Sequence, residues 1–311
     1  MVASDSAGKI QHSTIHVAEC PACSERSSRS WGLESGEPIL KCTMCGSVFF
    51  ERPISRPHDY ETYYPYLAEF DHSRYKWELD QRRRNFRFQL REIERLKPPG
   101  RQLVDFGAGP GYFCAVAEEA GWKALAIETS APAIDAGSTE FGVRYTTLEC
   151  LQEGSCSVLT AFHVLEHLDA PSTFLRALRL KLAAGGVLVV HVPNRESLSA
   201  FLRYWLRRLF RGSGDRRGSL YYPEHITGFT PAGLTLCADH AGFELIRLRQ
   251  RTMFSQFYDP WLTRNYFFDV IGRPKRGGAI ALAHRLLFGL CDQLGSVIGR
   301  GDWLVAHFRA R

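Results

Sequence analysis

Apolar positions along residues 101–250 alternate between short continuous runs and a helical period. The runs, which predict buried strands, are 102–106, 123–128, 157–162, 187–192 and 243–248. The intervals with apolar residues three and four positions apart, which predict helices, are 113–120, 131 onward, 171–182 and 231–241. Strands that alternate with helices indicate an α/β fold with a parallel, doubly wound sheet. Gly185-Gly186 predicts a turn before the fourth run, and residues 303–308 predict a final strand.

Three more helices are predicted outside this alternation. Residues 73–97 form one, with Leu79, Phe86, Leu90 and Ile93 near one face and Pro98-Pro99-Gly100 at its end. Residues 198–209 have an apolar face interspersed with arginines, which suits a cover over a site, an anion-binding surface or a membrane surface. Residues 279–298 form the third, a candidate dimer face or pocket wall.

Changes in composition predict four regions. Residues 1–19 are a polar leader that we expect to be disordered, and residues 20–50 are punctuated by cysteines. Residues 51–100 are rich in aromatic residues and arginine and read as a helical cap and linker. Residues 101–311 form the main domain, in which 195–222 and 260–300 read as insertions.

The overall composition is that of a globular protein. Of 311 residues, 45% are hydrophobic and 23% are charged, which excludes a disordered or collagen-like chain. The net charge of +6 permits an anionic partner without requiring nucleic acid. We see no secretory signal and no apolar run near the ~20 residues that span a bilayer, so we expect a cytoplasmic protein without a membrane span.

A glycine-rich loop follows the first strand of the main domain. Asp105 ends that strand, Gly107, Gly109 and Gly111 follow, and Tyr112 opens the next helix. A dinucleotide fingerprint would place a glycine at Tyr112, and a P-loop would need Gly-Lys-Ser/Thr. An acid before the glycines suits a ligand with an ammonium group, and Glu128 after the second strand suits ribose hydroxyls.

Four cysteines have the spacing of a metal site. Cys20, Cys23, Cys42 and Cys45 form C-x2-C-x18-C-x2-C, which lies within the range of zinc sites. Four thiolates fill a tetrahedral coordination shell, so we expect structural rather than catalytic zinc. His12 and His16 are weaker ligand candidates in the leader. The other five cysteines show no pairing pattern and read as buried, inert thiols.

At this point the sequence resembles the class I S-adenosylmethionine-dependent methyltransferases, in particular the branch of the ubiquinone O-methyltransferases. The resemblance rests on five motifs in order, which are Asp105 to Gly111, Ala126 to Ser130, Thr160 to Leu168, Gly185 to Asn194 and Pro223 to Thr230. It implies a Rossmann-like, seven-stranded sheet that ends in an antiparallel strand, preceded here by a small zinc ribbon. It also implies that S-adenosylmethionine binds at Asp105, Gly107, Ala108, Gly109, Gly111, Glu128, Thr129, Phe162 and His163.

The resemblance also implies where the acceptor and its proton are handled. His163 and His225 are the candidate bases, since both should lie at the edge where the methyl group is presented. Where that branch has Glu, Glu and His as a metal-binding triplet, this chain has His163, Glu166 and His167, so a catalytic divalent metal is in doubt. We expect Glu166 and His167 to hold the loop. The expected acceptor contacts are Tyr63, Tyr64, Asn194 and Tyr222, and the insertion at 195–222 would be a lid.

The sequence therefore predicts methyl transfer to a small or medium-sized metabolite. A hydroxyl on a sugar, a polyketide or a related compound of secondary metabolism is the first choice, and C- or N-methylation remains open. The alternative from another class is a nucleic-acid or protein binder with a degenerate catalytic domain. The intact glycine loop and Glu128 argue against that alternative.

Overall fold

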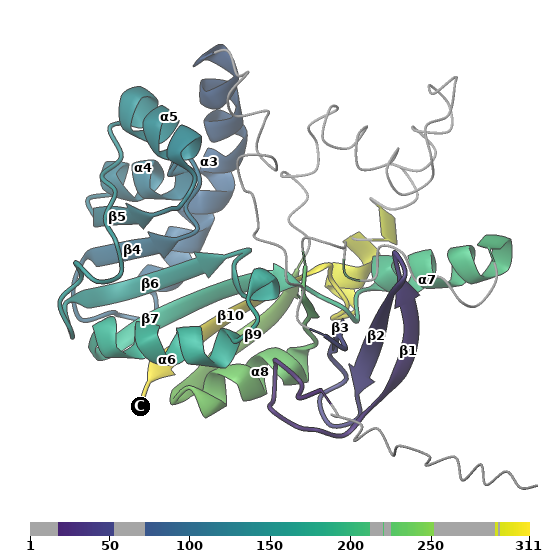
Figure 1. Ribbon diagram of the computed structural model, residues 1–311. Helices are drawn as coiled ribbons and strands as arrows, with labels where there is room; N and C mark the ends of the chain where they lie inside the picture. Colours follow the sequence, from purple (N-terminus) through teal and green to yellow (C-terminus); the bar gives the residue numbers. More distant parts are fainter. Residues whose placement is uncertain (1–17, 53–71, 212–219, 221–224, 252–289, 292) are drawn as a thin grey trace, which may run out of the picture.

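The computed structural model describes residues 18–52, 72–211, 220, 225–251, 290–291 and 293–311 (Figure 1). Several sequence predictions fall outside these residues. They are the leader up to residue 17, Tyr63, Tyr64 and Tyr222, and most of the insertion at 260–300.

The larger sheet has the strand order β5-β4-β6-β7-β10-β9. Its strands are β4 (Gln102–Phe106), β5 (Lys123–Ile127), β6 (Cys156–Phe162), β7 (Leu182–Pro193), β9 (Phe243–Arg251) and β10 (Trp303–Ala310). β4 pairs in parallel with β5 and β6, and β6 with β7, whereas β10 is antiparallel to both of its neighbours. In the place of a seventh strand, a parallel bridge joins Ala126 to Tyr145. The predicted α/β fold with one antiparallel strand is confirmed.

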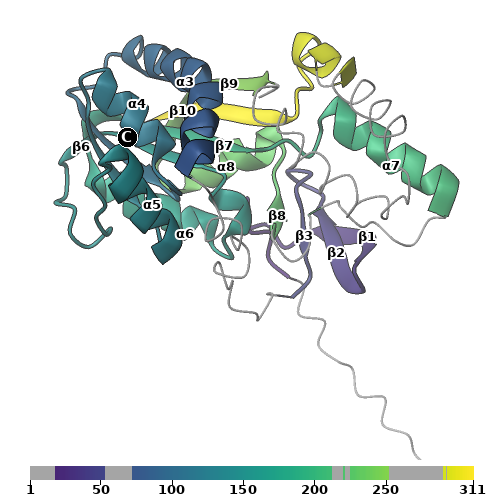
Figure 2. The same ribbon diagram turned by 90° about the horizontal axis from the view of Figure 1, so that it is seen from above.

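Helices cover both faces of this sheet (Figures 1 and 2). One face carries α3 (His72–Glu94), α4 (Tyr112–Glu119) and α5 (Ala131–Phe141), and the other carries α6 (Pro171–Lys181) and α8 (Pro231–His240). Neighbouring residues of β4 point to opposite faces, so Leu103 packs with Phe86 and Phe113 while Val104 packs with the α6 side. The face of α3 predicted to be apolar is buried at Leu79, Phe86, Leu90 and Ile93.

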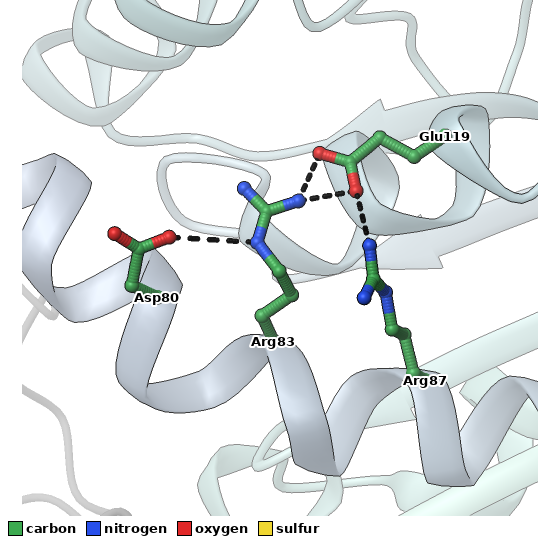
Figure 3. A network of polar contacts seen from close by, with 4 residues as sticks. All are labelled: Asp80, Arg83, Arg87 and Glu119. Atoms are coloured by element: carbon green, nitrogen blue, oxygen red, sulfur yellow. Dashed lines mark hydrogen bonds and ion pairs between the residues drawn. The ribbon is translucent and has the colours of Figure 1, made fainter.

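Ion pairs join α3 to α4 at the surface (Figure 3). Arg83 pairs with Glu119, and Arg87 Nη2 lies 3.4 Å from Glu119 Oε2. Arg83 Nε also lies 3.5 Å from Asp80 Oδ1. Exposed pairs of this kind contribute about 0–1 kcal/mol, so the buried contact of Phe86 with Phe113 does more to hold α3 in place.

The structure differs from the sequence prediction at Gly185-Gly186. Instead of a turn that precedes a strand, β7 begins at Leu182, directly after α6. Cys156 of β6 pairs with Leu182, but Val158 pairs with Val187, so β7 carries extra residues opposite Ser157. Gly185 has a φ of +76°, which suits this irregularity because glycine adopts left-handed conformations without strain.

A second sheet has four strands in the order β1-β2-β3-β8. β1 (Ser28–Glu34), β2 (Glu37–Cys42) and β3 (Val48–Phe50) come from the cysteine-rich region. β8 (Thr227–Gly228) comes from the far side of the lid insertion, and pairs antiparallel with β3. Figure 1 shows this sheet beyond the edge at which β6 and β7 end. The basic amphipathic helix predicted from the sequence is α7 (Leu198–Arg211). The ring of its Tyr204 stacks on the ring of Trp31 in β1, with 6.1 Å between the ring centroids.

Among the described residues, no helix combines the length and the hydropathy needed to cross a membrane.

Candidate functional site

The glycine loop connects β4 to α4 at the carboxyl edge of the larger sheet. Gly107, Gly109 and Gly111 all have positive φ, between +55° and +71°. A Cβ at Gly107 would lie 2.7 Å from Val164, and one at Gly111 would lie 2.6 Å from Val143, so neither position accepts a side chain. A Cβ at Gly109 would meet no atom within 4 Å. The loop is therefore packed tightly on two sides and open at Gly109, where a ligand can approach the backbone.

Glu128 lies against this loop. Its Oε2 accepts a hydrogen bond from Gly109 N at 2.8 Å, and its Oε1 accepts from Thr129 N at 2.6 Å and Ser130 N at 3.0 Å. Tyr145 donates from its hydroxyl to Gly109 O at 2.9 Å. The glycine loop and the acid after the second strand, which the sequence predicted to share one ligand, are in direct contact.

Asp105 is a buried carboxyl beneath the loop, with 3% of its surface exposed. Its pKa is raised to about 7, chiefly by burial; the hydrogen bond from Thr160 Oγ1 at 2.5 Å opposes this rise, and the charge of Glu128 adds to it. A cationic group close to Asp105 would return it to the charged form. The position therefore suits a ligand with an ammonium group, and the binding of such a ligand at Asp105 stays a prediction.

The chain leaves β6 through Phe162 and His163. The ring of Phe162 stacks on the ring of the buried His191, with 4.0 Å between the ring centroids. His163 has a φ of +60°, which is uncommon for a residue with a side chain, and its N–H donates to His191 O at 2.9 Å. Its ring also lies 4.0 Å from the ring of Trp303 on β10. The surroundings thus hold His163 in a strained backbone conformation, a frequent property of functional residues.

A cluster of histidines surrounds the buried Glu166, whose surface is 1% exposed. His163 Nδ1 lies 3.3 Å from Glu166 Oε1, and the rings of His167 and His225 lie 4.8 Å apart. Glu166, His167 and His225 each place a ligand atom within 4.8 Å of the others. The two candidate bases, His163 and His225, therefore lie around one carboxylate. Glu166 Oε2 has no hydrogen-bond partner, so this atom can accept from a further donor or cation.

The electrostatics of this cluster keep its members in different protonation states. Burial alone would raise the pKa of Glu166, but the hydrogen bond with His163 and the charges of the three histidines hold it below its ordinary value. Burial lowers the pKa of His225 to about 4, although Glu166 opposes this. Near neutral pH the cluster therefore contains a carboxylate and a neutral imidazole at His225.

Asn194, a predicted acceptor contact, makes hydrogen bonds within the protein. It is 3% exposed, and its Nδ2 donates to Gln250 Oε1 at 2.8 Å and to Gly301 O at 2.7 Å. Its Oδ1 accepts from Glu196 N at 3.0 Å. The amide is thus engaged within the protein, where it ties the end of β7 to β9 and to the chain before β10. The acceptor contact of Asn194 stays a prediction.

The four cysteines of the spaced motif converge. Cys20 Sγ lies 3.8 Å from Cys45 Sγ, and Cys23 Sγ lies 3.6 Å from Cys42 Sγ, so these sulfurs are not bonded as disulfides. Zn–S bonds of about 2.3 Å in a tetrahedron place sulfurs about 3.8 Å apart, which matches these distances. All four cysteines are buried, and burial raises the pKa of Cys23 to about 12. Because buried thiolates need a compensating cation, the donor set fits Zn²⁺.

Sequence reasoning missed the residues that connect the cysteine cluster to the rest of the site. Thr230 Oγ1 donates to Cys45 O at 2.5 Å and accepts from Gly233 N at 3.0 Å, so Thr230 caps α8. Thr230 followed by Pro231 is a recognisable start of a helix, but the contact with Cys45 has no sequence signal.

The comparisons with known proteins agree with this geometry. The family model described as "Methyltransferase domain" matches residues 78–248. The chain is 30% identical over 177 residues to the "Ubiquinone biosynthesis O-methyltransferase" of Cupriavidus pinatubonensis, a match that covers 51% of this chain and 67% of that protein. It is 27% identical over 184 residues to the protein of the same name from Xanthomonas axonopodis pv. citri, which covers 55% of this chain and 72% of that protein.

The chain was also aligned with solved structures. A SAM-dependent methyltransferase from Archaeoglobus fulgidus aligns with a TM-score of 0.47 and 16% identity, over 76% of this chain and 98% of its own. A SAM-dependent methyltransferase from Thermotoga maritima aligns with a TM-score of 0.46 and 18% identity, over 79% of this chain and 99% of its own.

The buried histidines predict a loss of stability in acid. Burial lowers the pKa of His225 and His307 to about 4 each, and that of His191 well below its ordinary value. Between about pH 6.5 and 4 the unfolded chain binds more protons than the folded one. The stabilisation is therefore complete above about pH 6.5 and is lost as the pH falls towards 4. The free energy of unfolding, from urea titrations, should be lower at pH 5 than at pH 7.5.

His307→Gln isolates one of these contributions. The free energy of unfolding should then differ between pH 7.5 and pH 5 by about 2 kcal/mol less than in the wild type. The reason is that the variant lacks one group that binds a proton on unfolding in acid. Asp105, whose pKa is raised, acts in the opposite direction in both proteins and cancels in the comparison. If the free energy of unfolding changes between pH 7.5 and pH 5 by the same amount in the variant and the wild type, the assignment of His307 is contradicted.

Proposed function

Because this chain belongs to the methyltransferase domain family and is an S-adenosylmethionine-dependent methyltransferase, we propose that it methylates a hydroxyl group of a small or medium-sized metabolite. The observation that supports a hydroxyl acceptor most is the position of the histidine cluster. Val164 lies against Gly107, so the loop with His163 and Glu166 adjoins the glycine loop. The group that accepts a proton therefore lies next to the cofactor site.

The cofactor residues that we propose are those of the glycine loop and its two carboxylates. S-adenosylmethionine supplies a methyl group that is already activated on a positively charged sulfur. Asp105 would bind the ammonium group, and Glu128 the ribose hydroxyls, with the backbone of Gly107, Ala108, Gly109 and Gly111 close to the ligand. Thr129, Phe162 and His163 complete this proposed set. The open space at Gly109 and the raised pKa of Asp105 support the assignment.

For proton removal we propose His163 as the base and His225 as its partner. Glu166 faces Nδ1 of His163, an arrangement that orients the imidazole and leaves Nε2 for the acceptor hydroxyl. His225, with its pKa near 4, is a weak base but stays neutral and can accept a hydrogen bond. A divalent metal held by Glu166, His167 and His225 is the alternative for this cluster, favoured by the orphaned Glu166 Oε2.

The names of the relatives support O-methylation, but they name neither a sugar nor a polyketide. The acceptor class is therefore proposed only as a hydroxyl compound, and C- or N-methylation is the second candidate. The direct test is to incubate the protein with S-adenosylmethionine and a panel of catechols, phenols, sugars and amines, and to measure the release of S-adenosylhomocysteine. Turnover restricted to amines would contradict the proposal.

We also propose that residues 20–50 form a structural zinc module and that α7, within residues 195–222, covers the acceptor. The sulfur distances support the first assignment. The stacking of Tyr204 on Trp31 supports the second, since it holds α7 beside the module.

The first prediction concerns cofactor affinity. Asp105→Ala and Glu128→Ala should each weaken S-adenosylmethionine binding by about 1–3 kcal/mol, because each removes a charge-assisted hydrogen bond to the ligand. Titration calorimetry measures this. Glu153→Gln, at an exposed position before β6, is the matched control and should bind like the wild type. Unchanged affinity in both alanine variants would remove the assigned cofactor site.

The second prediction concerns the metal. The purified protein should contain one zinc per chain, and Cys42→Ser should lose it, because a tetrahedral site with three thiolates binds the ion more weakly. Elemental analysis of protein purified without chelators measures the content. Cys150→Ser, which changes an exposed cysteine outside the cluster, should retain the metal. Zinc-free wild-type protein would refute the assignment.

The third prediction concerns the proton. With an acceptor identified from the panel, His163→Ala or His225→Ala should lower kcat by about 10²–10⁴-fold, and His225→Ala should leave cofactor affinity near that of the wild type. The wild-type rate should rise with pH through an imidazole titration, and this limb should disappear in the variant that lacks the base. His240→Ala, at an exposed position on α8, should leave the rate unchanged. If both variants keep full activity and a chelator has no effect, the catalytic assignment is wrong.

A further inference from the structure

We infer that the cysteine cluster positions the loop that carries His225, so that metal bound at residues 20–45 controls acceptor chemistry without controlling cofactor binding. This inference rests on the proposed function for the role of His225. The structural coupling itself rests on four contacts between the cysteine-rich module (residues 18–52) and the segment 220–234.

The first contact is a backbone pairing. β8 is the fourth strand of the module's sheet, with Val48 opposite Gly228 and Phe49 opposite Thr227. Phe49 is buried beside the cysteines in the main hydrophobic cluster. His225 precedes β8 by two residues, so the position of its backbone follows directly from that of β3.

The second contact fixes the other end of the loop. Glu34, which is buried in the module, accepts a hydrogen bond from Leu220 N at 2.8 Å. The side chain of Leu220 packs in a small cluster with Ile39, Val48 and Phe50. Leu220, before His225 in the chain, and Thr227, after it, therefore both contact the module.

The third and fourth contacts involve the second cysteine knuckle itself. Thr230 donates to the carbonyl oxygen of Cys45 at 2.5 Å while it caps α8. Gly233 lies so close to Ser47 that a Cβ at this position would overlap the serine hydroxyl. A change in the conformation of residues 42–47 would therefore displace the start of α8.

The same segment touches the histidine cluster on its other side. Ile226 N donates to Glu166 O at 2.7 Å, one residue after His225. Residues 225–230 thus connect the cysteine cluster to Glu166 over a few residues. The glycine loop is held differently, by Val164, Val143 and Glu128, all of which belong to the larger domain.

The physical reason for a coupling is the small core of the module. Three short strands and two knuckles bury few apolar side chains, so the metal would supply much of their folding energy. Without metal, β3 loses its fixed position and β8 loses its partner. The glycine loop, which rests on the larger sheet, keeps its structure.

Hydrogen exchange with mass spectrometry tests this on the full chain. Zinc-loaded protein is compared with protein stripped by a chelator and with stripped protein after zinc is returned. Stripping should speed exchange in peptides covering 225–230 by at least tenfold and leave peptides covering 103–112 unchanged. The affinity for S-adenosylmethionine should stay within twofold, acceptor turnover should fall at least tenfold, and zinc should restore all values.

A pair of variants separates positioning from global stability. Thr230→Val removes the donor to Cys45 O, whereas Thr230→Ser keeps it. Thr235→Val removes a hydroxyl that bonds only to Pro231 O within α8, and serves as the matched control. Thr230→Val should retain zinc, speed exchange at 226–228, shift the imidazole resonances of His225 and lower kcat with cofactor KM unchanged. Thr230→Ser and Thr235→Val should behave like the wild type.

Unchanged exchange at 225–230 after zinc removal would overturn the inference. So would an equal increase in exchange at 103–112, since the module would then support the whole fold and not this loop. If zinc-loaded protein fails to bind S-adenosylmethionine, the proposed function fails instead, and the exchange data still judge the coupling.

Discussion

The close approach of two loops at the carboxyl edge of the sheet is the constraint on which the site depends. Gly107 has no room for a side chain because Val164 lies against it. The parallel pairing of β4 with β6 brings these loops to the same edge, and the glycine allows them to touch. Without this contact the proposed cofactor residues and the histidine cluster would be separate features. With it, a ligand bound at the glycine loop would lie beside His163 and Glu166.

Two buried carboxyls at this edge show how the environment assigns different roles to similar groups. Asp105 lies among apolar neighbours and near Glu128, so its pKa rises to about 7. Glu166 is equally buried, yet three histidines keep its pKa below the ordinary value. The first carboxyl can therefore become charged when a cation binds, and the second is ionised near neutral pH and accepts from or faces the imidazoles. Burial is common to both, and the neighbours decide the outcome.

The cysteine-rich module is joined to the main domain by backbone pairing and hydrogen bonds. Its sheet would expose β3 as an edge, and β8 covers that edge with residues from the main domain. The pairing joins residues about 180 positions apart in the chain, as Thr230 does with Cys45. A small module that cannot build a large core gains stability from such a partner strand, and would gain more from a metal bound by its four cysteines. The same pairing holds β8 in a fixed position close to the histidine cluster around Glu166.

Residue patterns alone predicted the elements, the order of the motifs and the candidate ligand sets. Apolar periodicity located α3, α4, α6 and α8 to within a few residues, because those patterns depend on local geometry and burial. The spacing of the four cysteines and of the glycines predicted their convergence for the same local reason. Only the tertiary structure decided that Asn194 is engaged internally, that β7 absorbs Gly185-Gly186, and that β8 joins the cysteine-rich sheet. These features depend on contacts between segments that are distant in the sequence. Such contacts produce no repeating pattern of residue types, so they cannot be predicted from the sequence.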